Sequence, residues 1–195
     1  MKQSDIVDGR WSSALMGVDA WSDFDRMFQK HKGCGGCWCT YHLCTYPEFE
    51  GMTRDERREA HLEMIKAGLT TGVVCYLDDV PVGWCQFGPA DIFRHTNRKR
   101  TYQKFDKDNP LKPDWRITCI FVDKNYRGRG LARKVLAEGI AAIKLQGGGV
   151  TEAFPFVIPD KKIPEYTGSV EMYQAEGFEE VTKLGKYIVL MRAVL

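Results

Sequence analysis

The stretch ITCIFVDKNYRGRGLARKVL (residues 117–136) constrains the fold more than any other part of the chain. An apolar run predicts a buried strand, and the periodic apolar residues from Leu131 onward predict an amphipathic helix. Two glycines between them allow a tight turn and leave backbone N–H groups uncovered. The first N–H groups of a helix lack intrahelical partners, and the helix dipole adds partial positive charge there. This geometry is typical of a phosphate site.

Basic side chains gather at the same end of the predicted helix. Lys124, Arg127, Arg129 and Arg133 add positive charge, and Ala132 allows a ligand to approach closely. The motif is neither a GxxxxGK[ST] loop nor GxGxxG, because the residues read GRGLAR and no suitable acidic residue follows about 20 residues later. Spacing alone leaves two interpretations: a phosphate or pyrophosphate site, or a tight turn that opens an ordinary helix.

The remaining pattern predicts a mixed α/β sheet with helices on its faces. Strands 72–78 and 80–88 flank a turn at Asp78-Asp79 and indicate an antiparallel hairpin. The strand at 116–123, the helix at 131–145 and the strand at 150–156 indicate a right-handed crossover between parallel strands. Other expected elements are helices at 19–31 and from Thr53 to about Leu69, a short helix ending at Gly177 and a last strand at 186–195. A strand before the first helix is hard to see, and 89–114 reads as a long irregular excursion.

Composition limits the function classes. A chain of 195 residues, 44% hydrophobic and 28% charged, is in the range of one globular domain. A net charge of +2 argues against a nucleic-acid partner. No apolar run has the 18 or more residues of a membrane helix, and the first residues lack the apolar centre of a signal peptide, so we expect no membrane partner and a cytoplasmic protein. The oligomeric state stays open, with a homodimer as one alternative.

The strand–turn–helix resembles the signature of the GNAT superfamily of acetyl-CoA-dependent N-acetyltransferases. In that signature a hydrophobic strand precedes Arg/Gln-x-x-Gly-x-Gly/Ala at a helix start; Val122, Arg127, Gly130 and Ala132 match it. Members often carry a tyrosine four residues before a Gly-Phe pair, as Tyr173 does here. The likeness covers residues 70–193 well and the first 70 weakly. One departure is Lys124, where the superfamily often has proline. The CGGCWC segment looks like that of an uncharacterised bacterial branch.

The resemblance implies a GNAT-like mixed, mostly antiparallel sheet with helices on both faces and a parallel strand–helix–strand core. It implies one domain over residues 1–195, with a helical acceptor-side segment at 1–70 and a cofactor-binding sheet at 71–195. The implied activity is transfer of the acetyl group of acetyl-CoA, as co-substrate, to a primary amine of a small molecule or peptide. The implied cofactor-binding residues are Phe121, Val122, Arg127, Gly128, Arg129, Gly130, Leu131, Ala132 and Arg133.

The resemblance also implies catalytic residues. The backbone N–H of Val122 is expected to face the thioester oxygen as it gains negative charge. Tyr173 is expected to protonate the departing thiolate, because a tyrosine pKa near 10 lies above a thiol pKa near 8.5; the alternative is a packed aromatic. Glu152 is a candidate base, the alternative being a solvent-facing strand carboxylate. Two alternatives stay open: His42 lines a substrate pocket, or a water chain removes the proton without a dedicated base. His61 is expected on the surface.

Seven cysteines cannot all pair internally. Cys34, Cys37, Cys39 and Cys44, with His31 and His42 nearby, raise the hypothesis of a zinc site. All these candidates fall within 14 residues, whereas structural zinc sites commonly use two separated pairs of ligands. We therefore expect buried structural thiols and no metal, with a metal site or a redox role as alternatives.

Two further features leave alternatives open. The basic residues at 94–104 read as solvated surface, or as a contact for the 3′-phosphate of CoA or for an acidic substrate. The aromatic residues of 21–46 read as a hydrophobic cluster or as the wall of an acceptor pocket. Other functions left open are a non-catalytic CoA-binding regulatory module and a metal-binding interaction protein that uses the cysteines.

Overall fold

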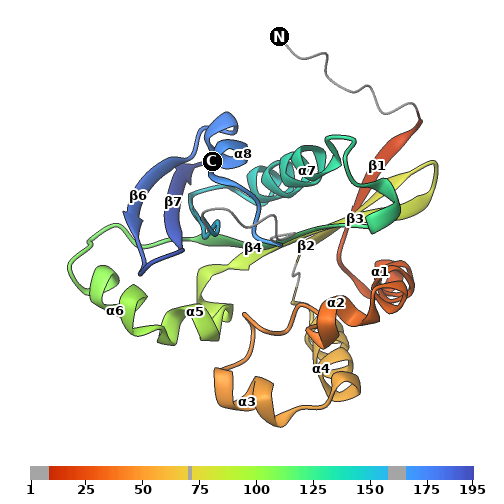
Figure 1. Cartoon of the computed structure of the whole chain (residues 1–195), viewed down its shortest axis with the longest axis horizontal. Coiled ribbons are helices and arrows are strands. Elements are labelled where there is room, and N and C mark those ends of the chain that lie inside the picture. The colour runs from red at the N-terminus through yellow and green to blue at the C-terminus, as the bar shows by residue number, and fades with distance from the viewer. Residues whose placement is uncertain (1–8, 70–71, 158–165) are drawn as a thin grey trace.

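The computed structural model describes residues 9–69, 72–157 and 166–195 and arranges them around a seven-stranded sheet of order β1-β2-β3-β4-β5-β7-β6 (Figure 1). Neighbouring strands are antiparallel except for the parallel pair β4 and β5, which confirms the predicted mixed, mostly antiparallel sheet. The strands are β1 (Trp11–Leu15), β2 (Gly72–Leu77), β3 (Val80–Pro89), β4 (Trp115–Val122), β5 (Val150–Ala153), β6 (Glu179–Lys183) and β7 (Val189–Val194).

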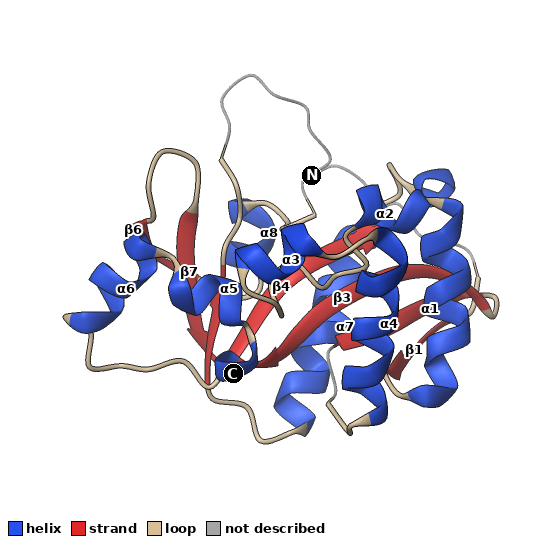
Figure 2. Cartoon of the chain, turned by 90° about the horizontal axis from the view of Figure 1, so that it is seen from below, coloured by secondary structure: helices blue, strands red, loops and turns tan. Residues whose placement is uncertain are grey.

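Helices cover both faces of the sheet, as predicted (Figures 1 and 2). The α-helices are α1 (Val18–Lys30), α2 (Lys32–Gly36), α3 (Tyr46–Gly51), α4 (Arg54–Lys66), α5 (Arg94–Arg98), α6 (Arg100–Lys107), α7 (Leu131–Leu145) and α8 (Val170–Ala175). The 3₁₀ turns are η1 (Ala90–Ile92) and η2 (Lys124–Tyr126). In the described ranges, no helix combines the length and apolarity needed to cross a membrane.

Helix α7 packs on one face of β2, β3 and β4. Its predicted apolar stripe is buried, with Leu131, Val135 and Ile143 at most 1% exposed. Strand residues that share this cluster include Ile120 and Val122. Because side chains alternate across a strand, Phe121 and Cys119 point to the other face.

That other face packs against the aromatic side of α1. Phe24, Met27 and Phe28, predicted at helical spacing, are fully buried there and share a cluster with Trp84 and Phe121. His61 of α4, expected on the surface, is also fully buried. Its ring lies edge-on to Phe24, 5.3 Å between centroids, because α4 turns its few buried positions toward α1. Arg58 of α4 also faces α1 and pairs with Asp25 at 2.5 Å.

Three parts of the chain differ from the sequence-based expectations. Strand β1 precedes the first helix and pairs with β2. The segment 89–114 is partly helical: Tyr102 of α6 is buried, with Phe105 packed in the same cluster, so one apolar face holds this charge-rich helix to the sheet. Strand β6 was not predicted, because its five residues are mostly polar; as an edge strand it leaves four of them exposed and one half-buried.

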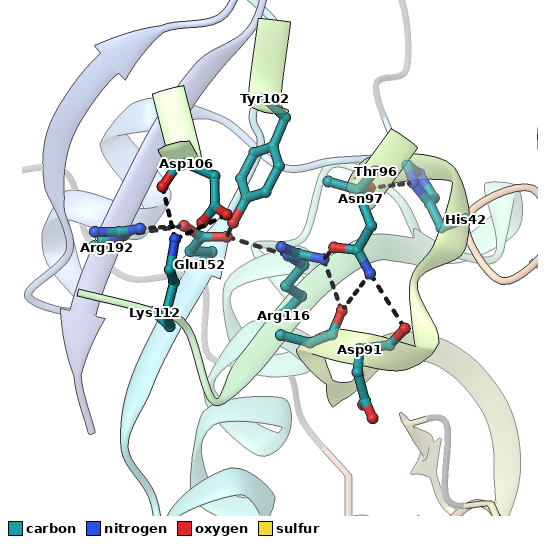
Figure 3. A network of polar contacts seen from close by, with 11 residues as sticks. His42, Asp91, Thr96, Asn97, Tyr102, Asp106, Lys112, Arg116, Glu152 and Arg192 are labelled. Carbon is teal, nitrogen blue, oxygen red and sulfur yellow. Dashed lines mark hydrogen bonds and ion pairs between the residues drawn. The ribbon is translucent and has the colours of Figure 1, made fainter. Parts of the chain in front are cut away.

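A buried ion-pair network joins α6 to the sheet (Figure 3). Glu152 of β5 lies directly opposite Arg116 of β4 and Arg192 of β7. Its Oε2 accepts from Arg116 Nε at 3.1 Å and from the Tyr102 hydroxyl at 2.9 Å; its Oε1 accepts from Arg192 Nη2 at 2.7 Å. Arg116 also donates to the carbonyl of Ala90 at 2.7 Å. The carboxylate therefore connects three strands and a helix.

Replacing Glu152 with Gln should destabilise the protein. The change leaves two buried guanidinium groups without a counter-charge, which costs about 3–5 kcal/mol. Urea unfolding measures the effect, with Glu180→Gln on the exposed strand β6 as the matched control, expected to stay within about 0.5 kcal/mol. A Glu152→Gln protein as stable as the control would contradict this account of the network.

His61 should make stability depend on pH. Burial lowers the pKa of His61 from 6.5 to about 4, although a hydrogen bond to the backbone of Trp38 opposes the shift. Below pH 6.5 the unfolded chain binds a proton there that the folded protein does not. The free energy of unfolding should therefore decrease as the pH is lowered from 6.5 to 4, by up to about 1.4 kcal/mol per pH unit.

The measurement is urea unfolding at several pH values for the natural protein and for His61→Gln, which cannot titrate. The difference between the two stability curves should be flat above pH 6.5 and slope below it. Parallel curves from pH 7 to pH 4.5 would show that His61 is protonated equally easily in both states.

Candidate active site

Strand β4 has an open edge over its second half. It pairs with β5 only from Trp115 to Ile117, and β5 then diverges. On its other side β4 pairs with β3, and the N–H of Asp123 donates to the carbonyl of Val82 at 2.9 Å. Alternate residues of a strand direct their main-chain N–H and C=O groups to opposite sides, so this bond shows which residues of β4 face β3. That alternation turns the main-chain groups of Ile120 and Val122 to the open edge.

Two contacts agree with this orientation. The Ile120 N–H donates to the carbonyl of Tyr166 at 2.5 Å, and the Val122 carbonyl accepts from Arg127 Nε at 3.0 Å. The segment around Tyr166 thus lies beside β4 where β5 has left it. The Val122 N–H, predicted to face the thioester oxygen, lies on the same edge.

A cavity of about 440 Å³ opens at this edge, between the turn, α7 and the segment that leads into α8. Most of the predicted cofactor-binding residues line it: Val122, Arg127, Gly128, Gly130, Leu131, Ala132 and Arg133. Ile120, Tyr166, Ser169 and Met172 complete the wall. Sequence reasoning did not name these four, and only Ile120, two residues before Val122 on the same strand face, carried a signal that could have found it.

Two predicted members lie outside this cavity. The Phe121 side chain is on the opposite face, 5.0 Å from the Phe28 ring between centroids, and its main chain lies in the β3 ladder. The Arg129 guanidinium lies over the ring of Tyr126, 5.6 Å from its centroid. Neither residue lines the cavity through its side chain.

The glycine turn has the form of an anion cradle. Gly128 and Gly130 have φ values of 77° and 73°, a left-handed conformation that favours glycine. A Cβ on either residue would meet nothing within 4 Å. In the described part of the chain, no acceptor bonds the backbone N–H of Gly128, Gly130 or Ala132. These donors and the exposed Arg133 converge at the start of α7, a suitable environment for a diphosphate.

Tyr173 lies behind the same edge. Its side chain is fully buried, and a Cβ on Gly168 would lie 3.1 Å from its ring and 3.0 Å from Ile120 Cδ1. Its hydroxyl has no hydrogen-bond partner among the described residues. Burial, with a smaller effect of the Cys85 and Cys119 thiols, raises the pKa of Tyr173 well above 10. The group therefore keeps its proton. Tyr173 is not one of the residues that line the cavity, because Gly168 lies between its ring and Ile120.

Glu152 does not have the geometry of a general base. It is fully buried, which excludes the alternative of a solvent-facing carboxylate. Both its oxygens accept hydrogen bonds from Arg116, Arg192 and Tyr102, so no lone pair is left for a substrate proton. His42 does line a pocket, but burial and nearby cations lower its pKa to about 3, so it would be a weak base.

The cysteines of the segment 34–39 meet a fourth thiol from β4. Cys39 Sγ lies 3.8 Å from Cys119 Sγ, and Cys34 and Cys37 act on the same pair electrostatically. Burial raises the pKa of Cys37 to about 11 and that of Cys39 well above 9. These thiols are protonated at neutral pH, which is typical of structural cysteines. Cys119 is 80 residues away from Cys39, so sequence reasoning did not include it.

The basic residues of the segment 94–104 differ in their exposure to solvent. Arg94 pairs with Glu48 at 2.9 Å and is exposed, as are Arg98 and Lys104. Lys99, by contrast, is half-buried. The segment covers the face of the sheet that carries Glu152, opposite the glycine turn, and this placement does not favour a contact with the 3′-phosphate of CoA.

The fold and the open edge define an acyltransferase of the GNAT type, and comparisons agree. The model of the Acetyltransferase (GNAT) family matches residues 37–178, so the chain belongs to this family. No curated protein matches the chain.

Solved structures share the fold at low identity. An acetyltransferase from Thermus thermophilus is 17% identical, with 95% of this chain and 97% of that chain covered and a TM-score of 0.53. The yncA protein of Salmonella typhimurium, solved with its cofactor acetyl-CoA, is 16% identical, with 95% and 94% covered and a TM-score of 0.51. The PaiA N-acetyltransferase of Thermoplasma acidophilum, in complex with coenzyme A, is 11% identical, with 95% and 99% covered and a TM-score of 0.53.

Gly130→Glu should abolish binding of CoA without unfolding the protein. The new carboxylate would enter the cavity where a diphosphate is expected, and charge repulsion should raise the dissociation constant at least ~100-fold. Isothermal titration calorimetry with CoA measures the affinity. Gly185→Glu is the matched control, because Gly185 has φ 84°, equally open surroundings and a position on the distant β6–β7 loop. Equal affinity in the two folded variants would exclude the turn as the diphosphate site.

Proposed function

We propose that this protein is an N-acetyltransferase that moves the acetyl group of acetyl-CoA to a primary amine of a small molecule or peptide. The observation that carries the proposal is the open edge of β4. A glycine turn with free N–H groups lies at one end of this edge, and the hydroxyl of Tyr173, unpartnered among the described residues, lies behind it. The acetyl-CoA and CoA held by two structural neighbours support the same interpretation.

The residues of the turn would hold the diphosphate of CoA. Backbone donors at Gly128, Gly130 and Ala132 and the charge of Arg133 suit its oxygens. Arg127 is positioned by its bond to the Val122 carbonyl, which leaves its remaining N–H groups for a phosphate. The apolar side chains of Ile120, Val122 and Met172 line the way from the turn to Tyr166.

Acetyl-CoA supplies the activated thioester when bound. The Val122 N–H can donate to an oxygen that gains negative charge at the open edge, and its position in the strand makes that donor preorganised. Tyr173 holds a proton close to the same edge and would give it to the leaving sulfur. We assign no protein base, because Glu152 is occupied and His42 is weakly basic. We propose a water chain for this step, which is one of the alternatives that the sequence left open.

The direct test is incubation with acetyl-CoA and a panel of amines that includes polyamines, aminoglycosides, amino acids and peptides. Free thiol should appear only when a suitable amine is present, and mass spectrometry should find the acetylated amine. Tight binding of CoA without thiol release for any amine would instead favour a non-catalytic CoA-binding module.

Tyr173→Phe should separate catalysis from binding. The phenylalanine ring fills the same buried site, and loss of an unpartnered hydroxyl should leave stability unchanged or slightly higher. The affinity for CoA should also be unchanged. The kcat should fall by about 10²–10⁴, and kcat/KM with it, because the proton is needed only as the thiolate forms.

Steady-state rates with a true acceptor, and single-turnover rates to isolate the chemical step, measure the loss. Tyr187→Phe, on the β6–β7 hairpin, serves as the control and should keep the natural rate. A Tyr173→Phe enzyme with an unchanged single-turnover rate would show that this hydroxyl takes no part in the reaction.

A further inference from the structure

The glycine turn carries more positive charge than the proposed diphosphate site uses. The stretch 124–134 leads from β4 through the turn into α7 (Figure 1) and contains no acidic residue and five basic ones: Lys124, Arg127, Arg129, Arg133 and Lys134. All five are exposed, and within residues 9–69, 72–157 and 166–195 none of them forms an ion pair with a carboxylate. Arg127 and Arg133 line the cavity. The other three cations have no assigned partner.

Arg129 is the one of these three that lies within the anion cradle itself. It stands between Gly128 and Gly130, whose main chains line the cavity, but its own side chain does not line it. The guanidinium instead lies 5.6 Å from the ring centroid of Tyr126 in the 3₁₀ turn η2. The Tyr126 ring is half-buried against the core under α7, so it gives the guanidinium a supported position at the rim of the cavity.

Coenzyme A has a second anionic group close to its diphosphate. One ribose carries the diphosphate at its 5′ position and a phosphate monoester at its 3′ position, and the monoester has a charge of about −2 at neutral pH. In the proposed complex the pantetheine arm runs from the turn toward Ile120 and Tyr166, inside the cavity. The ribose is attached to the other end of the diphosphate and leaves the cavity there. The 3′-phosphate therefore needs a cation at the rim of the turn, outside the cavity.

A second cation with aromatic support lies near the turn, but an acid accompanies it. Lys134 Nζ lies 5.5 Å from the ring centroid of Trp11. The Trp11 indole N–H donates to the carboxylate of Glu138 at 2.9 Å, so negative charge lies next to this contact and would repel a phosphate. The acid closest to Arg129 along the chain is Asp123, and its carboxylate is buried. Of the two supported cations, Arg129 is therefore the better placed for an anion.

We propose that Arg129 binds the 3′-phosphate of coenzyme A and that Tyr126 holds its guanidinium at the rim of the cavity. A planar guanidinium donates two parallel hydrogen bonds to phosphate oxygens, which an ammonium group does not. The inference rests on the proposed function, because it requires CoA in the cavity. The cradle binds a diphosphate, which dephospho-CoA also has. Arg129 recognises the one group that distinguishes CoA from dephospho-CoA.

Isothermal titration calorimetry with CoA and with dephospho-CoA, which lacks only the 3′-phosphate, tests the inference. The natural protein should bind CoA about 10-fold more tightly than dephospho-CoA. In Arg129→Met the dissociation constant for CoA should rise about 10-fold, the lower limit for a lost hydrogen bond between charged groups, because the site is open to solvent. The dissociation constant for dephospho-CoA should change less than about 2-fold. Lys134→Met is the matched control, since Lys134 is also exposed and supported by an aromatic ring, and it should keep the natural preference for CoA.

The outcomes distinguish this inference from the function on which it rests. If the natural protein binds CoA and dephospho-CoA equally, or if Arg129→Met weakens both to the same extent, the cavity holds the cofactor but Arg129 does not bind the 3′-phosphate. If Arg129→Met keeps the natural preference, the inference is also wrong, and loss of that preference in Lys134→Met would assign the phosphate to the other side of the turn. If neither ligand binds the natural protein, the proposed function fails together with the inference. Circular dichroism of the ligand-free variants checks that both are folded.

Discussion

The carboxylate of Glu152 holds together the part of the sheet from which the active-site geometry follows. It lies opposite Arg116 on one neighbouring strand and Arg192 on the other, at the middle of the short parallel pairing of β4 and β5. This pairing ends one residue later, at Ile117 and Ala153, so β5 no longer covers β4 beside Ile120 and Val122. The β3–β4 ladder turns the main-chain groups of these two residues to that open edge.

Beside the point where β4 and β5 diverge, the two faces of the sheet carry different cavities. On the α7 face, backbone donors of the glycine turn and arginine side chains line the cavity that we propose holds a diphosphate. On the opposite face, α5, α6 and the segment before α3 surround a small pocket with aromatic walls and one half-buried lysine. The residues 166–169 lie between the two, because Tyr166 and Ser169 line the larger cavity and Thr167 lines the small pocket.

The segment between α1 and α3 is attached to this framework by polar contacts. The Gln86 side chain donates to the Cys39 carbonyl at 2.6 Å and accepts from the Thr118 hydroxyl at 2.9 Å. Cys34, Trp38 and Cys39 have left-handed backbone conformations, which are uncommon for these residue types. Strained backbone persists where its surroundings hold it, and here the buried Cys39 side chain and the hydrogen bond from the buried Gln86 amide do so. The cysteines thus shape the wall next to β4 through packing.

The sequence by itself determined the features that depend on local pattern. These are the strand–turn–helix at 117–136, the apolar stripes of α1 and α7, and the β2–β3 hairpin. The grouping of the turn residues at one site also belongs here. All of them depend on periodicity and glycine positions, which act over a few residues. Only the tertiary structure decided the rest. Glu152 became a structural ion pair, His61 a buried residue and Lys99 a half-buried cation because their partners or neighbours lie far along the chain. Cys39 meets Cys119 from 80 residues away. The sequence predicted His61 on the surface, left Glu152 and Lys99 with more than one interpretation, and did not bring Cys39 together with Cys119. Packing against a distant strand or helix decided each case, since burial depends on which surfaces the fold brings together.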